Sequence, residues 1–268
     1  NTCSLRFAIF YASQYSRQHG SPATVHIPEG EFFLSVTNPI NLEGSLIIKG
    51  AGPDRTFIDG RGSAQTFGIF EVPHPERPNG EVHARIQDLT LRNGHTRVGG
   101  GGAVRWTPRN PASTLELVNV VITDNHAPVG GGLWLAGGRV LIEDSVIENN
   151  TAWSESDAKG GGILIDESSA HIRSEVTIRN TIIRNNEARS AASKGGGIAV
   201  TRPSVGGTLV IEDSVIRDNK AETGGGMYLD DVGRPVILAG ISMGAAIVSR
   251  IAVRRPDLVY GLALVRPA

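Results

Sequence analysis

Runs of three glycines recur through the chain, and each one directly precedes a short apolar segment. The segments are GGGLWL ending at Leu135, GGGILI at Ile165, GGGIAV at Val200 and GGGMYL at Leu229, with a looser copy, GGGGAVRW, ending at Trp106. The last glycines of these runs are about 30 residues apart, a period that is typical of stacked structural repeats. The repeat therefore predicts similar units stacked on one another.

A second block repeats between the glycine runs and aligns without a gap. Its copies are LELVNVVITDN, VLIEDSVIENN, VTIRNTIIRNN and LVIEDSVIRDN. These segments are short, β-branched and broken by turn residues, which favours strands over helices. Stacked coils of such strands form a parallel β-helix whose coils are ~4.8 Å apart. Two apolar columns are expected to face its core: Leu117, Ile142, Ile178, Ile211 and Ile122, Ile147, Ile183, Ile216.

Polar residues also fall in columns, and we interpret them as structural. Asn and Asp tolerate the left-handed backbone of a tight bend, and stacked amides hydrogen-bond one another. Alternating charges in neighbouring coils attract, and glycines allow a close approach of successive coils. The expected columns are Asn119, Asp144, Asn180, Asp213 at a bend, Glu143, Arg179, Glu212 beside it, and an amide ladder of Asn125, Asn150, Asn186, Asn219.

The segments before the regular repeats follow the same pattern less strictly. SLIIKG, TFIDG, FGIFEV and ARIQDLTLRNG are expected to be strands of earlier coils. Asn93 fits the amide ladder one place early, which predicts a register slip there, and the proline-rich segment 73–83 is expected to be a surface loop. At the start, Leu5, Ile9 and Ala12 share one helical face. A short helix there would cover the first coil, as a solenoid requires.

The opening of the chain carries a family resemblance. NTCSLRFAI, VHIPEGEF and LIIKGAGPDRTFIDG resemble the start of bacterial surface β-helix proteins with a Cys-Ser-Leu-Arg-Glu-Ala-Ile motif, although Phe7 replaces the Glu. The glycine and asparagine repeats resemble those of polymorphic outer-membrane proteins. The resemblance implies an all-β fold, a right-handed parallel β-helix, in an exported or surface-located protein that adheres to surfaces or contacts carbohydrate. It implies no catalytic residues.

The last 35 residues resemble a different family. The segment from Val236 contains Gly240-Ile241-Ser242-Met243-Gly244, followed by a helical stretch and the apolar segment 258–265. This order resembles the strand, nucleophile elbow, helix and strand of α/β-hydrolases. In that family the elbow serine is the nucleophile and the next backbone N–H helps to hold the oxyanion. The resemblance therefore implies these roles for Ser242 and for the backbone of Met243.

The tail can also be laid on the repeats. Val236 then falls over Leu209, and Gly240 falls over Asp213, where a left-handed bend suits glycine. We therefore expect a capping helix at 1–23, a β-helix at 24–232, and a segment 233–268 that adds a last coil and a C-terminal capping helix. The apolar segment 258–265 has no place in the stack, so pairing with a second chain, as in a homo-oligomer, is a further expectation.

Two functions follow from these resemblances. The first is a serine carboxylesterase that acts on small esters through Ser242. A serine needs a base within hydrogen-bond reach, yet no histidine follows His171, about 10 Å away along the axis. Nearer groups that could act as base are Asp213, Asp230, Asp231 and Lys220.

The alternative is a non-catalytic exported β-helix that binds carbohydrate or another surface, with the tail only a structural cap. Trp106, Trp134 and Trp153 offer stacking surface if they are not packed inside. A lyase or glycosidase is less favoured, because a glycosidase needs two carboxylates ~5–9 Å apart, and Asp144 and Asp213 are two coils apart in the alignment.

Composition excludes several other classes. The formal net charge is −1 without a basic cluster, so nucleic-acid binding is not expected. The histidines are scattered and Cys3 is the single cysteine, so neither a metal site nor a cofactor is expected. No apolar run has the length of a membrane span.

Overall fold

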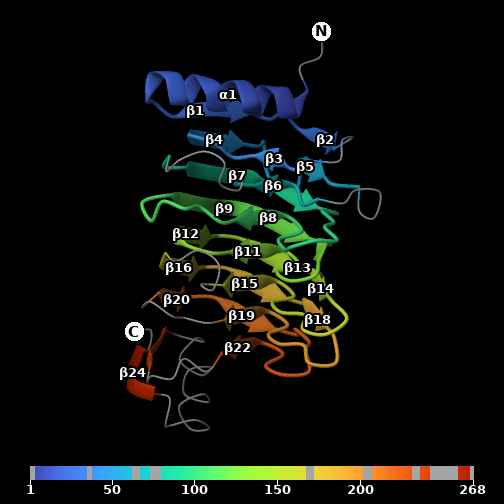
Figure 1. Ribbon diagram of the computed structural model, residues 1–268, viewed down its shortest axis with the longest axis vertical. Coiled ribbons are helices and arrows are strands. Elements are labelled where there is room, and N and C mark those ends of the chain that lie inside the picture. Colours follow the sequence, from blue (N-terminus) through green and yellow to red (C-terminus); the bar gives the residue numbers. More distant parts are fainter. Residues whose placement is uncertain are drawn as a thin grey trace.

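The computed structural model describes residues 4–34, 38–61, 67–72, 80–166, 172–201, 207–230, 236–241 and 259–265. Figure 1 shows one helix, α1 (Leu5–His19), at one end of a tall stack of strands. In each regular coil the chain passes through three sheets, which we name the first, second and third face in chain order. Neighbouring coils pair in parallel, which confirms the predicted all-β parallel arrangement.

The three faces are built from the following strands. The first face contains β1 (Ala23–His26), β2 (Gly30–Phe33), β4 (Ser45–Lys49), β5 (Thr56–Asp59), β7 (His83–Arg92), β9 (Thr114–Thr123), β12 (Gly138–Glu143), β13 (Val146–Glu148), β16 (Ser174–Arg179), β17 (Ile182–Arg184), β20 (Thr208–Glu212) and β21 (Val215–Arg217). The second face contains β10 (His126–Ala127), β14 (Thr151–Trp153) and β18 (Glu187–Arg189). The third face contains β3 (Ile40–Asn41), β6 (Phe70–Glu71), β8 (Val104–Trp106), β11 (Leu133–Leu135), β15 (Ile163–Asp166), β19 (Ile198–Thr201) and β22 (Met227–Leu229).

The core consists of the apolar columns that the repeats predict. Ile142 pairs with Leu117 on one side and Ile178 on the other, and Ile147 pairs likewise with Ile122 and Ile183. Each of these side chains is buried. Because side chains alternate across a strand, the same register also fixes which residues point outward on every face.

The amide ladder joins the first face to the second. The side-chain oxygen of Asn150 accepts hydrogen bonds from both the backbone N–H and the side-chain amide of Asn125, at 3.0 and 2.9 Å. Asn186 and Asn150 repeat this arrangement one coil further, as do Asn219 and Asn186. The side-chain amide of Asn150 also donates to the carbonyl of Ile122. The ladder thus bonds four successive coils.

The glycine runs lie next to the asparagine ladder, at positions where a side chain would collide with the neighbouring coil. The first glycine of each regular run has left-handed backbone, with φ of 57° at Gly130 and 62° at Gly160. A Cβ on Gly131 would lie 2.4 Å from the carbonyl oxygen of Gly161 in the next coil, and one on Gly132 would lie 3.2 Å from the Asn150 amide. The three glycines therefore supply the turn, the close coil contact and the room for the asparagine.

The bend within the first face has the predicted composition. Asn119 and Asp144 have positive φ values of 51° and 52°, and Asn180 and Asp213 continue this column. Amides and carboxylates bond across coils, from Asn119 to Asp88 at 2.8 Å and from Asn180 to Asp144. Beside the bend, Arg179 forms an ion pair with Glu143. Arg179 also pairs with Glu212 on its other side, so the predicted alternation of Glu143, Arg179 and Glu212 in successive coils is confirmed.

The predicted register slip at Asn93 is wrong. Strands β7 and β9 pair in one continuous register, with Arg92 opposite Thr123. Asn93 is therefore level with Asp124, and both have left-handed backbone, with φ of 55° and 57°. Gly94 takes the place of the ladder asparagine, and its N–H donates to the side-chain oxygen of Asn125 at 2.8 Å. The first coil of the ladder therefore keeps the backbone donor of the later coils and lacks their side-chain donor.

Helix α1 covers the first coil, as expected from its apolar face. Ile9 is fully buried in the core, and Leu5 and Ala12 pack against it. The helix begins at the N-cap Ser4 and ends at Gly20, whose φ is 65°. The hydroxyl of Ser16 accepts a hydrogen bond from the N–H of Ser45, at the start of β4. The helix thus closes the end of the stack from which the chain begins.

The tail forms a separate parallel pair. Strand β23 (Val236–Ile241) pairs with β24 (Val259–Val265), while the first face ends at β20 among the described residues. The predicted register of Val236 on Leu209 is therefore not among the pairings, although β23 and β20 lie close together. Strand β24, which the sequence left without a place, pairs along one edge with β23 of the same chain. Both strands are short and apolar, and a connection of more than a dozen residues permits their parallel pairing.

The ladder predicts a large effect of Asn150→Ala. The substitution leaves the N–H of Asn125 and the carbonyl of Ile122 buried without these partners. Each buried group left unpaired costs about 1–3 kcal/mol, so we expect a loss of about 3 kcal/mol or more in the free energy of unfolding. Urea denaturation followed by circular dichroism measures it. Asn149→Gly, at the exposed neighbouring bend with φ of 56°, is the control and should change stability by less than about 0.5 kcal/mol. Equal losses would contradict the role of the ladder.

Candidate functional site

The serine suggested by the tail lies outside the described residues. This holds for Ser242, for the backbone of Met243, for the expected capping helix within 245–255, and for His171. The structure describes the strands on either side, β23 and β24. The esterase site therefore stays a prediction, and the described residues place a different site at the opposite end of the stack.

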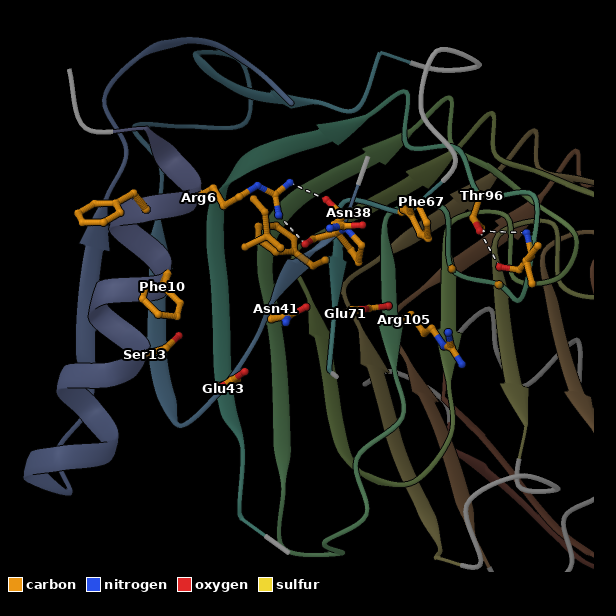
Figure 2. Close-up of a pocket in the computed structure, with 18 of the residues that line it drawn as sticks. Arg6, Phe10, Ser13, Asn38, Asn41, Glu43, Phe67, Glu71, Thr96 and Arg105 are labelled. Atoms are coloured by element: carbon orange, nitrogen blue, oxygen red, sulfur yellow. Dashed lines mark hydrogen bonds between the residues drawn. The ribbon is translucent and has the colours of Figure 1, made fainter. Parts of the chain in front are cut away.

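A groove of 870 Å³ runs between α1 and the third face (Figure 2). Phe7 and Phe10 of α1 line one side, and Phe67 and Val98 line it further along the stack. Between them the outward side chains of β3, β6 and β8 form the floor. Apolar walls with a few polar groups on the floor are typical of ligand sites.

The floor belongs to a single column fixed by the strand register, of which Asn41, Glu71 and Arg105 line the groove. Asn41 pairs with Glu71, Glu71 with Arg105, and Arg105 with Trp134. These residues point outward because their neighbours Ile40, Phe70, Val104 and Trp106, and Leu133 and Leu135 beside Trp134, are buried. The column therefore offers an amide, a carboxyl, a guanidinium and an indole in successive coils along the axis of the stack.

Burial shapes the electrostatics of this floor. Desolvation raises the pKa of Glu71, and the positive charge of Arg105 acts in the opposite direction. The guanidinium of Arg105 lies 4.9 Å from the centre of the Trp134 ring, a cation–π arrangement. Its Nε atom is buried and has no hydrogen-bond partner among the described residues. Arg105 is thus held by stacking rather than by a carboxylate.

Two further charged residues border the groove next to α1. Arg6 donates hydrogen bonds to the carbonyls of Pro39 and Asn38, at 2.5 and 2.6 Å (Figure 2). Burial lowers the pKa of Arg6. Glu43 forms an ion pair with Arg17 at 2.7 Å. The carbonyl contacts fix Arg6 at the edge of the groove.

The three tryptophans do not form one stacking surface. Trp106 is fully buried and donates its indole N–H to the carbonyl of Gly137 at 3.0 Å. Trp134 continues the column one coil beyond Arg105, and Trp153 is exposed on β14 of the second face. Only Trp134 is therefore placed next to the groove, and the exposed rings that line it are phenylalanines.

The described residues hold no group of three or more His, Cys, Asp or Glu side chains suited to a metal ion. Asp144 and Asp213 are bend residues with left-handed backbone. Within the same part of the chain, no helix has both the length and the apolar character needed to cross a membrane.

Comparison with known proteins bears on the fold. Residues 81–239, more than half of the chain, match the family model described as the right handed beta helix region. The chain belongs to this family. No curated protein and no solved structure matches it. The family match covers the regular coils of the β-helix, whereas α1 and the first groove strands precede it.

The sequence singled out Trp134, beside the groove, as a possible stacking surface, but none of the residues that line the groove, although the repeat contained a signal for Arg105. Aligning the glycine runs of the β-helix places Arg105, Trp134, Leu164, Ala199 and Tyr228 in one column, between inward-facing neighbours. This middle column changes from a charged residue to an aromatic one, then to two aliphatic residues, and ends in the aromatic Tyr228. Phe10, Asn41 and Phe67 carry no such signal, because the first coils and the helix depart from the repeat.

A histidine pair is expected to make the free energy of unfolding depend on pH. The rings of His95 and His126 stack in adjacent coils with centres 4.8 Å apart. Burial lowers the pKa of both; Arg97 adds to the effect at His95, and His95 and Arg189 add to it at His126. The unfolded chain therefore binds more protons below about pH 6.5.

We expect the free energy of unfolding to fall as pH decreases through and below about 6.5. Urea denaturation at a series of pH values measures this. His126→Gln removes one titrating ring and relieves the other of its charged neighbour, so its stability should depend less steeply on pH. An identical pH dependence in the variant would contradict the assignment.

Proposed function

We propose that this protein is an exported surface β-helix that binds an extended carbohydrate in the groove between α1 and the third face, without catalysing a reaction there. The observation that carries the proposal is the floor column Asn41, Glu71 and Arg105, which follows the strand register along the axis of the stack and is continued by Trp134 beside the groove. Export to the cell surface is the part of this proposal that comes from the resemblance of the N-terminal segment.

The spacing of the column suits a polymer. Successive coils repeat every ~4.8 Å, so the floor offers one polar side chain for each step of a chain-like ligand laid along it. A sugar unit presents hydroxyl groups at its edges and C–H groups on its faces. The amide of Asn41 both donates and accepts hydrogen bonds, the guanidinium of Arg105 donates, and the carboxylate of Glu71 accepts. The phenylalanine walls match the apolar faces of the sugar rings.

The aromatic walls give the first test of this function. Phe10 and Phe67 are 56% and 41% exposed, so Phe10→Ala and Phe67→Ala should change stability little. We expect each to weaken carbohydrate binding about tenfold, the equivalent of one buried aromatic contact. A glycan array identifies the ligand, and isothermal titration calorimetry measures the affinity.

Phe33→Ala is the matched control, because Phe33 is 47% exposed and lies on β2 outside the groove. It should leave the affinity unchanged. Absence of any bound glycan for the wild-type protein, or equal losses in all three variants, would overturn the proposal.

Ester hydrolysis at Ser242 is the second candidate function. The parallel pairing of β23 with β24 favours it, because a strand, elbow, helix and strand unit brings its two strands together in parallel. In this proposal Ser242 is the nucleophile, the N–H of Met243 stabilises the oxyanion, and small esters are the substrates. The division into a capping helix at 1–23, a β-helix at 24–232 and a tail at 233–268 belongs to the same proposal.

Ser242→Ala tests this candidate. Loss of a serine nucleophile should abolish hydrolysis of p-nitrophenyl acetate above the uncatalysed background. A fluorophosphonate probe should label the wild-type protein at Ser242 and leave the variant unlabelled, as mass spectrometry would show. Equal turnover in both proteins, or labelling at another residue, would exclude Ser242 as the nucleophile.

A further inference from the structure

The charges that line the groove do not balance. The charged side chains along it are Arg6, Arg105, Glu43 and Glu71. Glu43 is paired with Arg17 from α1. Within the described part of the chain, neither Arg6 nor Arg105 has a carboxylate within ion-pair distance: Arg6 contacts backbone carbonyls and Arg105 lies against Trp134. The groove therefore has two guanidinium groups that are not neutralised by direct ion pairs.

Glu71 compensates these charges only in part. It occupies the coil next to Arg105, and its burial favours the neutral acid. A carboxyl whose pKa is raised takes up a proton at higher pH than an ordinary glutamate, so mild acidification makes the groove more positive. The other groups around it are the amide of Asn41 and the charges of Arg105, Arg6 and Glu43.

Arg105 is suited to recognise an anion. Its position over the Trp134 ring restricts the side chain before any ligand binds, so less conformational entropy is lost on binding. A guanidinium is a planar fork of N–H donors that matches the two oxygens of a carboxylate or a sulfate. The Nε atom of Arg105 is buried, and reduced contact with water strengthens such an interaction.

From this imbalance we infer that the groove selects anionic polysaccharides, which carry carboxylate or sulfate groups, and that Arg105 determines this selectivity. The inference rests on the proposed carbohydrate binding and names the class of ligand. Carboxylate and sulfate share the chemistry that a guanidinium recognises, and the experiment separates them.

The test compares three oligosaccharides of the same length, one neutral, one carboxylated and one sulfated, by isothermal titration calorimetry. We expect the wild-type protein to bind one or both of the anionic ligands at least about tenfold more tightly than the neutral one. Arg105→Gln should weaken anionic binding by about ten- to a hundredfold and leave neutral binding nearly unchanged. Arg105→Lys keeps the charge but lacks the planar fork of N–H donors, so it should recover only part of the preference.

Arg139→Gln is the matched control, since Arg139 is an exposed arginine on β12 of the first face, away from the groove. It removes the same charge from the protein and should leave all affinities unchanged. An equal loss in Arg105→Gln and Arg139→Gln would show an effect of net charge alone and would overturn the role of Arg105.

Glu71→Gln gives an independent readout that does not require Arg105 to be changed. It removes the negative charge from the floor, so at neutral pH it should bind the anionic ligand more tightly than the wild-type protein. The wild-type affinity should rise as the pH decreases toward about 5, while the affinity of Glu71→Gln should change less. Identical pH dependence in both proteins would contradict the inference.

The outcomes separate the two proposals. If none of the three oligosaccharides and no glycan on the array binds the wild-type protein, the proposed carbohydrate binding fails. If the neutral oligosaccharide binds as tightly as the anionic ones and Arg105→Gln changes neither affinity, carbohydrate binding stands and the selectivity for anions fails.

Discussion

The structure depends on hydrogen bonds between asparagine side chains of successive coils. In each regular coil a buried asparagine oxygen accepts two N–H groups from the coil before it. This contact is possible because glycines of the neighbouring face leave room for the amide and for the carbonyl of the next coil. The asparagine and the glycine run therefore constrain each other, which explains why both recur with the same period.

The register that the asparagine ladder sets between coils also determines which side chains point outward on each face. The column that forms the groove floor is polar in its first coils and becomes aliphatic and buried at Leu164 and Ala199. Helix α1 borders only the first coils, and the groove lies there. The same register that builds the core thus confines the polar floor to one end of the stack, next to the aromatic side chains of the helix.

Much of the fold follows from the sequence. A single short segment can be assigned wrongly, but four aligned copies show which positions are apolar, polar or glycine in every coil. The apolar columns, the bend residues and the amide ladder were each visible in four aligned copies. Asn93 was misread, since asparagine occurs in two adjacent columns: Asn93 belongs to the left-handed column of Asp124, and Gly94 occupies the ladder position without a side-chain amide. The groove was less predictable: Arg105 lies in the repeat, whereas Phe10 and Phe67 come from segments without a period. The pairing of β23 with β24 fits the order of strand, elbow, helix and strand, whereas the alignment of the tail on the repeats left the segment 258–265 without a partner.

Amide hydrogen exchange at the ladder tests this account most directly. The backbone N–H groups of Asn125, Asn150 and Asn186 donate to side-chain oxygens of the next coil rather than to backbone carbonyls. Measured by NMR, these amides should exchange as slowly as those of the central core strands, with the free energy of global unfolding. Fast exchange of these three amides beside protected strands would show that the asparagine ladder does not hold the coils together.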